Sequence, residues 1–295
     1  MNIQSLSVCV PAGCPNRCKF CVSRLHHNNY KHDNYDHIDI DRLEFARDNG
    51  CNSVILTGTG EPLYNIEYIR RFLDINQSLP NRFKCVEIQT SGVHKQDPDI
   101  YKYLATNGVK TISLSLASLD WKTNFEILQT APHLRIDDFI KRVCADILEA
   151  GLNLRLSLNI NKEGYGGLYN VLTDNKHNIH GYLTAMFEYC HKLGAHQLVF
   201  RQLYNSNNNY NYEISEWINQ NKIDICDIFK YIQSYGRKLE MLPYGKVRYS
   251  ICGMSVVVDD DCMSTNPDVD AIRYLILREN NKLYTKWDDE GSLLF

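Results

Sequence analysis

Residues 11–24 read PAGCPNRCKFCVSR and place three cysteines at C-x3-C-x2-C directly after a short apolar run. Pro11, Gly13 and Pro15 make this stretch a loop rather than a helix. Thiolates spaced so closely in sequence converge on one metal centre. We therefore predict that its three cysteines are metal ligands in a loop that follows the first strand: Cys14, Cys18 and Cys21.

The number of cysteines in the loop bears on which metal it holds. An iron–sulfur cube normally takes four cysteines, so a three-cysteine loop leaves one iron open to another ligand. Zinc is the alternative, and it usually takes a fourth Cys or His nearby, which His26 or His27 would supply. A position after the first strand of a barrel, where the C-terminal face carries active sites, favours a [4Fe-4S] cluster.

Outward from this loop, short β-branched runs alternate with longer segments of helical period, which indicates repeated βα units and a parallel sheet. Strands are expected at 3–10, 52–57, 84–90, 110–117, 152–160 and 196–203. Helices are expected at about 38–49, 65–77, 97–107, 136–150 and 180–193. We predict an α/β fold, a partial (β/α)6 TIM-like barrel with a C-terminal β-rich extension.

The pattern changes after the sixth strand. Residues 1–204 are expected to form the barrel core, and 205–236 a helical connection. From residue 237 the period drops to two, which predicts an antiparallel β appendage over 237–295 that caps the substrate site.

The composition indicates which partners and which cellular compartment to expect for this protein. A net charge of −3 gives no global basic field for nucleic acid or an anionic membrane, although nucleic acid is not excluded as a partner. Eleven cysteines, an odd count, argue against a disulfide framework. No apolar run of 18 residues occurs, and the opening residues lack the pattern of a secretory signal. We expect a cytoplasmic protein with no membrane partner.

The motif CPNRCKFC resembles the signature of radical S-adenosylmethionine (radical SAM) enzymes. This resemblance implies that the open iron binds the methionine amino and carboxylate groups of SAM. It further implies that one electron, from a reductant such as flavodoxin or ferredoxin, cleaves SAM to a 5′-deoxyadenosyl radical that abstracts hydrogen from the substrate. The substrate stays open between a nucleotide or nucleic acid, a peptide and a small metabolite.

A second motif, LTGTGEPLYN at residues 56–65, ends the second predicted strand. It is similar to the Gly-Gly-Glu-Pro segment of the same family, which meets the methionine amino group of SAM, and the form GTGEPL is similar to that of radical rRNA methyltransferases. The resemblance implies cofactor contacts at Gly58, Gly60 and Glu61. The alternative is a tight βα turn.

Polar residues end the later strands. In relatives, hydroxyls at the third and fourth strand ends contact the cofactor, and Thr90 and Ser115 match them. Asn159 is assigned to the ribose and Arg201 to the carboxylate or the substrate, with ordinary rim residues as an equal alternative. SLAS at 115–118, this asparagine and FRQ at 200–202 are similar to the molybdenum-cofactor cyclase group.

The C-terminal part departs from those relatives. Cys226, Cys252 and Cys262 do not match the spacing of the second cluster in the cyclases, so one cluster is expected and a second is a minority alternative. Cys252-Gly253 is similar to the methyl-carrying cysteine of the rRNA enzymes, with a hairpin cysteine as the favoured alternative. A non-catalytic zinc or iron–sulfur redox-sensing module is the rival to an enzyme.

Overall fold

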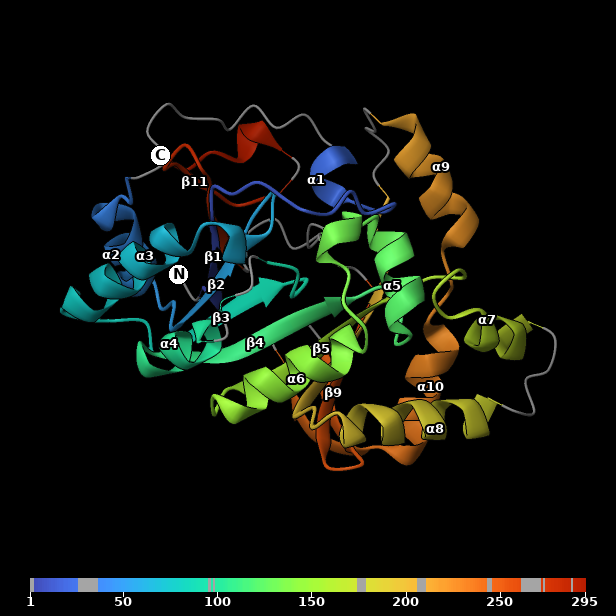
Figure 1. Cartoon of the computed structure of the whole chain (residues 1–295). Coiled ribbons are helices and arrows are strands. Elements are labelled where there is room, and N and C mark those ends of the chain that lie inside the picture. Colours follow the sequence, from blue (N-terminus) through green and yellow to red (C-terminus); the bar gives the residue numbers. More distant parts are fainter. Residues whose placement is uncertain are drawn as a thin grey trace.

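The computed structural model describes residues 3–25, 37–94, 97, 99–173, 179–205, 211–242, 246–260, 272, 274–287 and 289–295. Within them one 11-stranded sheet runs in the order β11-β10-β1-β2-β3-β4-β5-β6-β9-β8-β7 (Figure 1). The end strands β11 and β7 do not pair with each other, so the sheet curls without closing. The predicted α/β partial barrel is confirmed.

The six predicted barrel strands form in order, each within two residues of its predicted ends, and neighbours pair in parallel. Their bounds are β1 Ser5–Cys9, β2 Ser53–Thr57, β3 Cys85–Thr90, β4 Val109–Leu116, β5 Asn153–Ile160 and β6 Gln197–Gln202. Parallel pairing brings all their carboxyl ends to one end of the barrel.

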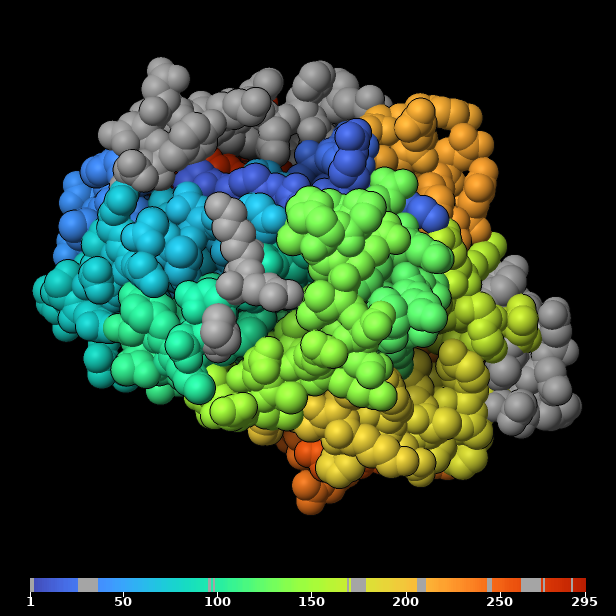
Figure 2. Space-filling view, in the orientation of Figure 1, coloured from blue at the N-terminus to red at the C-terminus, as the bar shows by residue number. Residues whose placement is uncertain are grey.

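Helices connect these strands and cover the outer face of the sheet, as Figures 1 and 2 show. The five predicted helices are present as α2 Ile40–Asp48, α3 Ile66–Ser78, α4 Ile100–Thr106, α6 Phe139–Glu149 and α8 Ile179–Lys192. Three helices were not predicted: α1 Val22–Leu25, α5 Trp121–Leu128 and α7 Gly166–Thr173. Short 3-10 turns occur at Pro62–Tyr64, Pro132–Leu134 and Glu290–Ser292.

The C-terminal part joins the same sheet at both edges. It contains α9 Tyr212–Asn221, α10 Cys226–Tyr235, β7 Arg237–Met241, β8 Val247–Ile251, β9 Met254–Asp259, β10 Tyr274–Leu277 and β11 Leu283–Tyr284. The predicted antiparallel pairs are present in β7-β8-β9 and β10-β11. In addition, β9 lies parallel to β6 and β10 lies parallel to β1, which the period-two pattern did not reveal because it does not encode strand direction.

The two faces of the sheet differ in chemistry. Alternate residues such as Leu56, Ile88 and Leu156 point outward and are fully buried beneath the helices. The intervening residues point to the inner face and are mostly polar, as in Glu87 and Arg155. The core therefore lies between sheet and helices, while the inner face stays available for polar groups. Within the described residues no helix is long and apolar enough to cross a membrane.

Candidate active site at the carboxyl ends of the strands

The cysteine loop begins where β1 ends and lies against the GTGEP segment that ends β2. The backbone N–H of Glu61 donates to the carbonyl of Gly13 at 3.0 Å. A Cβ added to Gly60 would lie 2.1 Å from the carbonyl oxygen of Ala12, and one added to Gly58 would lie 2.7 Å from that of Val10. The absence of a side chain at these glycines therefore allows two backbone segments to touch. From the sequence, the same glycines were expected to contact the cofactor.

The side chain of Glu61 is buried and joins the ends of β2 and β3. Its Oε1 accepts from the Thr90 hydroxyl at 2.5 Å and from the Leu63 N–H. Its Oε2 accepts from the N–H and the hydroxyl of Ser91 at 2.8 and 2.6 Å. Burial raises the pKa of this carboxyl, and the hydrogen bonds from Ser91 and Thr90 oppose the rise.

Asn16, inside the cysteine motif, extends this network to the metal-ligand loop. Its amide Nδ2 donates to the Ser91 hydroxyl at 2.9 Å, and its Oδ1 accepts from the Thr130 hydroxyl at 2.7 Å. Two backbone bonds, from Arg17 and Lys19 to the last turn of α5, fix the loop further. Asn16, Ser91 and Thr130 were not predicted as parts of the site, since α5 was not predicted and the partners lie 75 and 114 residues apart in sequence.

The three cysteines of the loop are free thiols, with Cys14 exposed and Cys18 and Cys21 partly buried. Desolvation raises the pKa of Cys14 to about 11. Desolvation also raises the pKa of Cys18, and the negative charges that Cys21 and Cys14 would carry raise it further. Cys14 and Cys18 therefore resist ionisation on their own, and the positive charge of a bound metal would stabilise their thiolates.

The cysteine loop offers three thiols, which are the ligand type of an iron–sulfur cluster. Among the described residues, no three His, Cys, Asp or Glu side chains form a group that could hold a metal ion. The thiolates of a cube bind separate iron atoms and so need not meet at one point. His26 and His27, the ligands considered for zinc, lie outside the described residues.

The other predicted contact residues divide between the two faces of the sheet. Ser115, Asn159 and Arg201 lie on the inner face near the carboxyl ends of β4, β5 and β6, and Arg201 is in register with both Asn159 and Asp259. Thr90 is in register with the buried Leu114 on the opposite face. The Thr90 hydroxyl donates to the carboxylate of Glu61. The predicted contact between Thr90 and the cofactor would therefore have to be made by the backbone groups of Thr90 at the end of β3.

A charged network lies on the inner face closer to the other end of the strands. Nη1 of Arg155 lies 2.5 Å from both carboxylate oxygens of Glu87, across β4. Its Nε donates to Gln197 at 2.8 Å. In the strand register, Thr111 of β4 is the partner of Glu87, and Ser113 of β4 is the partner of Arg155. On this part of the inner face, the positive charge of Arg155 is thus neutralised by the negative charge of Glu87.

Cys252 lies far from the cysteine loop. It forms the β8–β9 turn with Gly253, and both have positive φ. Because β9 runs parallel to β6, this turn is at the amino ends of the barrel strands, opposite the cysteine loop. This position supports the hairpin cysteine, which the sequence already favoured over a methyl-carrying cysteine. Cys262 lies outside the described residues.

Solved structures of known proteins agree with the overall fold of this chain. SuiB of Streptococcus suis bound to its precursor peptide SuiA aligns with a TM-score of 0.58 and 17% identity over 96% of this chain and 59% of that one. The enzyme anSMEcpe with bound AdoMet aligns with a TM-score of 0.57 and 12% identity, over 99% of this chain and 74% of that one. This chain thus spans about three fifths of the length of SuiB.

At such low identities these structural matches establish the fold alone. No curated protein sequence matches the chain. The family model "Radical SAM superfamily" matches residues 8–158, which is half of the chain and includes the cysteine loop, GTGEP, Thr90 and Ser115. The chain therefore belongs to the radical SAM superfamily, whose members are enzymes that use a [4Fe-4S] cluster and S-adenosylmethionine.

Proposed function

We propose that this protein reductively cleaves S-adenosylmethionine at one [4Fe-4S] cluster and abstracts hydrogen from a substrate on the inner face of the barrel. The observation that carries the proposal is the hydrogen-bonded frame that joins the cysteine loop to GTGEP and the end of β3. When bound, the cluster supplies the electron that breaks the sulfonium bond of SAM, and the substrate radical chemistry follows from that cleavage.

The residues of this chain have separate tasks in the proposal. Cys14, Cys18 and Cys21 would hold the cluster, and the Asn16–Ser91–Glu61 chain of hydrogen bonds would keep their loop in one orientation. Gly58, Gly60, Glu61 and Thr90 would offer backbone groups to SAM, while Ser115, Asn159 and Arg201 would offer side chains from the inner face.

The substrate is proposed to be polar. The inner face carries the Glu87–Arg155 pair, Gln197 and several hydroxyls, and its charges are balanced. Of the structures similar in fold, one is SuiB with a precursor peptide and another is anSMEcpe with a Cp18Cys peptide. A peptide is therefore the first substrate class to test, with nucleotides and small metabolites next. The physiological reductant is proposed to be a flavodoxin or ferredoxin in the cytoplasm.

Product analysis tests this function. The wild-type protein, reconstituted with iron and sulfide without oxygen, should convert SAM to 5′-deoxyadenosine and methionine when dithionite is added. The Cys18→Ala variant should make neither product. A colourless wild-type protein that contains zinc would instead support the redox-sensing or zinc-binding rival.

Iron analysis separates one cluster from two. We expect about four irons per wild-type chain, the content of one cube. Replacing Cys226 and Cys252 by alanine should leave that number unchanged. About eight irons per chain would instead support the alternative that the protein holds a second cluster.

A further inference from the structure

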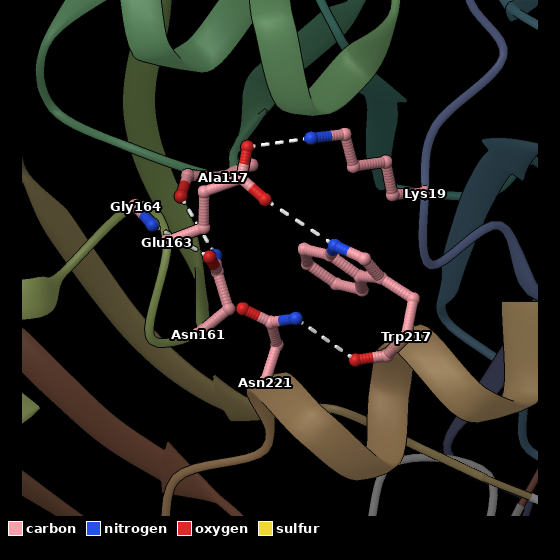
Figure 3. Close-up of polar contacts among 7 residues, drawn as sticks. All are labelled: Lys19, Ala117, Asn161, Glu163, Gly164, Trp217 and Asn221. Carbon is pink, nitrogen blue, oxygen red and sulfur yellow. Dashed lines mark hydrogen bonds and ion pairs between the residues drawn. The ribbon is translucent and has the colours of Figure 1, made fainter.

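The carboxylate of Glu163 joins the cysteine loop to the C-terminal helix α9 (Figure 3). Its Oε1 lies 2.6 Å from Nζ of Lys19, the residue that follows Cys18. Its Oε2 accepts from the indole N–H of Trp217 on α9 at 3.2 Å. Both oxygens are thus engaged, one by the loop that would bind the cluster and one by a helix outside the family match at residues 8–158.

The backbone that carries Glu163 is fixed to the end of β4. Nδ2 of Asn161 donates to the carbonyl of Ala117 at 2.8 Å, and its Oδ1 accepts from the N–H of Gly164 at 2.7 Å. The Ser118 hydroxyl donates to the carbonyl of Gly164 at 3.0 Å. A Cβ at Gly164 would lie 1.9 Å from the Ala117 oxygen, so the loop packs directly against the strand. Glu163 therefore projects from a support that has little freedom to move.

Trp217 is held on its other sides as well. Its ring stacks on Phe20 with the centroids 6.1 Å apart and the planes inclined by 30°. Its carbonyl accepts from the side chain of Asn221 at 3.1 Å (Figure 3). Phe20 and Cys21 pack with Trp217 around the buried residues Leu25, Leu203, Ile214 and Ile218. The two residues between Cys18 and Cys21 are thus each held by the Glu163–Trp217 pair.

We propose that Glu163 is a positioning residue for the cysteine loop. It fixes Lys19 and, through Trp217, Phe20, and thereby sets the orientation of the Cys18 and Cys21 thiolates toward the cluster. This rests on the proposed function, in which those thiolates bind iron. The Lys19 and Glu163 side chains are 27% and 32% exposed, so their pairing contributes little to the stability of the fold. Its effect is on geometry close to the metal ligands.

The rate of iron release tests this role. Reconstituted proteins are mixed with an excess of a ferrous chelator without oxygen, and the coloured iron–chelator complex is followed. Residues just outside a metal's own ligands typically change affinity by about 10- to 100-fold, and Glu163→Ala should release iron about tenfold faster than wild type. Lys19→Met, which breaks the same contact from the loop side, should also release iron faster. Glu163→Gln keeps one acceptor and should fall between wild type and Glu163→Ala.

The matched control is Glu240→Ala, which removes another exposed ion pair, with Arg248, from the β7–β8 hairpin. It should release iron at the wild-type rate. The iron-free variants should all melt within about 4 °C of wild type, because an exposed pair contributes at most about 1 kcal/mol.

Three results would overturn the proposal. One is a wild-type release rate for both Glu163→Ala and Lys19→Met. Another is early melting of iron-free Glu163→Ala well beyond that range, which would assign Glu163 to the stability of the fold. The third is a wild-type protein that takes up no iron, which would remove the proposed function too. The first two leave that function standing.

Discussion

At the scale of single residues, the site depends on contacts that leave no room for side-chain atoms. Gly60 touches the carbonyls of Ala12 and Gly13, and the next residue, Glu61, collects four hydrogen bonds with its buried carboxylate. The Ser91 hydroxyl also accepts a hydrogen bond from Asn16, which connects this network to the cysteine motif. The glycines and the acid of GTGEP therefore help to shape the cysteine loop through contacts within the protein.

Gly60→Ala tests the close approach of the two backbones. The added methyl group would lie 2.1 Å from the Ala12 oxygen, so one of the backbones must shift. We expect a loss of about 1–3 kcal/mol in the free energy of unfolding, measured with urea, and weaker iron uptake. Gly13→Ala is the control, because a Cβ there meets nothing within 4 Å. Equal stability of the two variants would contradict the contact.

At the scale of elements, α5 supports the cysteine loop from the side. The carbonyls of Ile127 and Leu128, in its last turn, accept from the N–H groups of Lys19 and Arg17 at 3.0 and 2.9 Å. Its first turn is capped by Asp120, which accepts from the N–H of Thr123 at 2.9 Å. Capping at one end of the helix thus helps to hold the loop at the other.

Asp120→Ala tests this cap and its pH dependence. Hydrogen bonds from Thr123 lower the pKa of Asp120 in the folded protein. A lowered folded pKa gives stability that is present above the unfolded value of about 3.9 and is lost as pH falls through the folded pKa. The variant should therefore unfold about 1 kcal/mol more easily than wild type at pH 7, and this difference should shrink below about pH 4.

Asp99→Ala is the matched control for the cap. Asp99 occupies the N-cap of α4 without a capping hydrogen bond from its side chain. Its replacement should cost less at pH 7 than that of Asp120. An Asp120→Ala cost that stays constant from pH 7 to pH 3 would contradict the assigned cap.

At the scale of the whole molecule, the curled sheet presents a polar inner face, and the cysteine loop lies at the carboxyl ends of its strands. The Glu87–Arg155 pair links β3 to β5 across β4 on that face. Its side chains are 13% and 24% exposed, so the charges are only partly screened by water. The pair therefore contributes to the sheet and to the chemistry of its inner face at once.

Arg155→Met tests how far that pair stabilises the barrel. It leaves a half-buried carboxylate without its cation, and we expect a loss of about 2 kcal/mol in the free energy of unfolding. The double variant Glu87→Gln with Arg155→Met removes the stranded charge and should recover part of the loss. Urea unfolding at pH 7 measures both. A double variant less stable than the single one would contradict this explanation.

Much of this arrangement could be predicted from the sequence. The runs rich in β-branched residues predicted all six barrel strands. The spacing of Cys14, Cys18 and Cys21 predicted the loop at the carboxyl ends of these strands. The sequence did not reveal that β9 and β10 run parallel to the barrel strands, since alternation looks the same in either direction. It also did not reveal Asn16 or Glu163 as parts of the site, because their partners are brought close only by the fold.

Cys14, Cys18 and Cys21 are proposed to hold a cluster with one iron open to S-adenosylmethionine. The most direct measurement is the electron paramagnetic resonance spectrum of the dithionite-reduced protein with and without SAM. We predict the signal of one reduced [4Fe-4S] cluster in the wild type, a change in that signal when SAM is added, and no signal in Cys18→Ala. A wild-type signal that SAM leaves unchanged would exclude an iron open to SAM, and a zinc-containing protein with no signal would exclude the cluster itself.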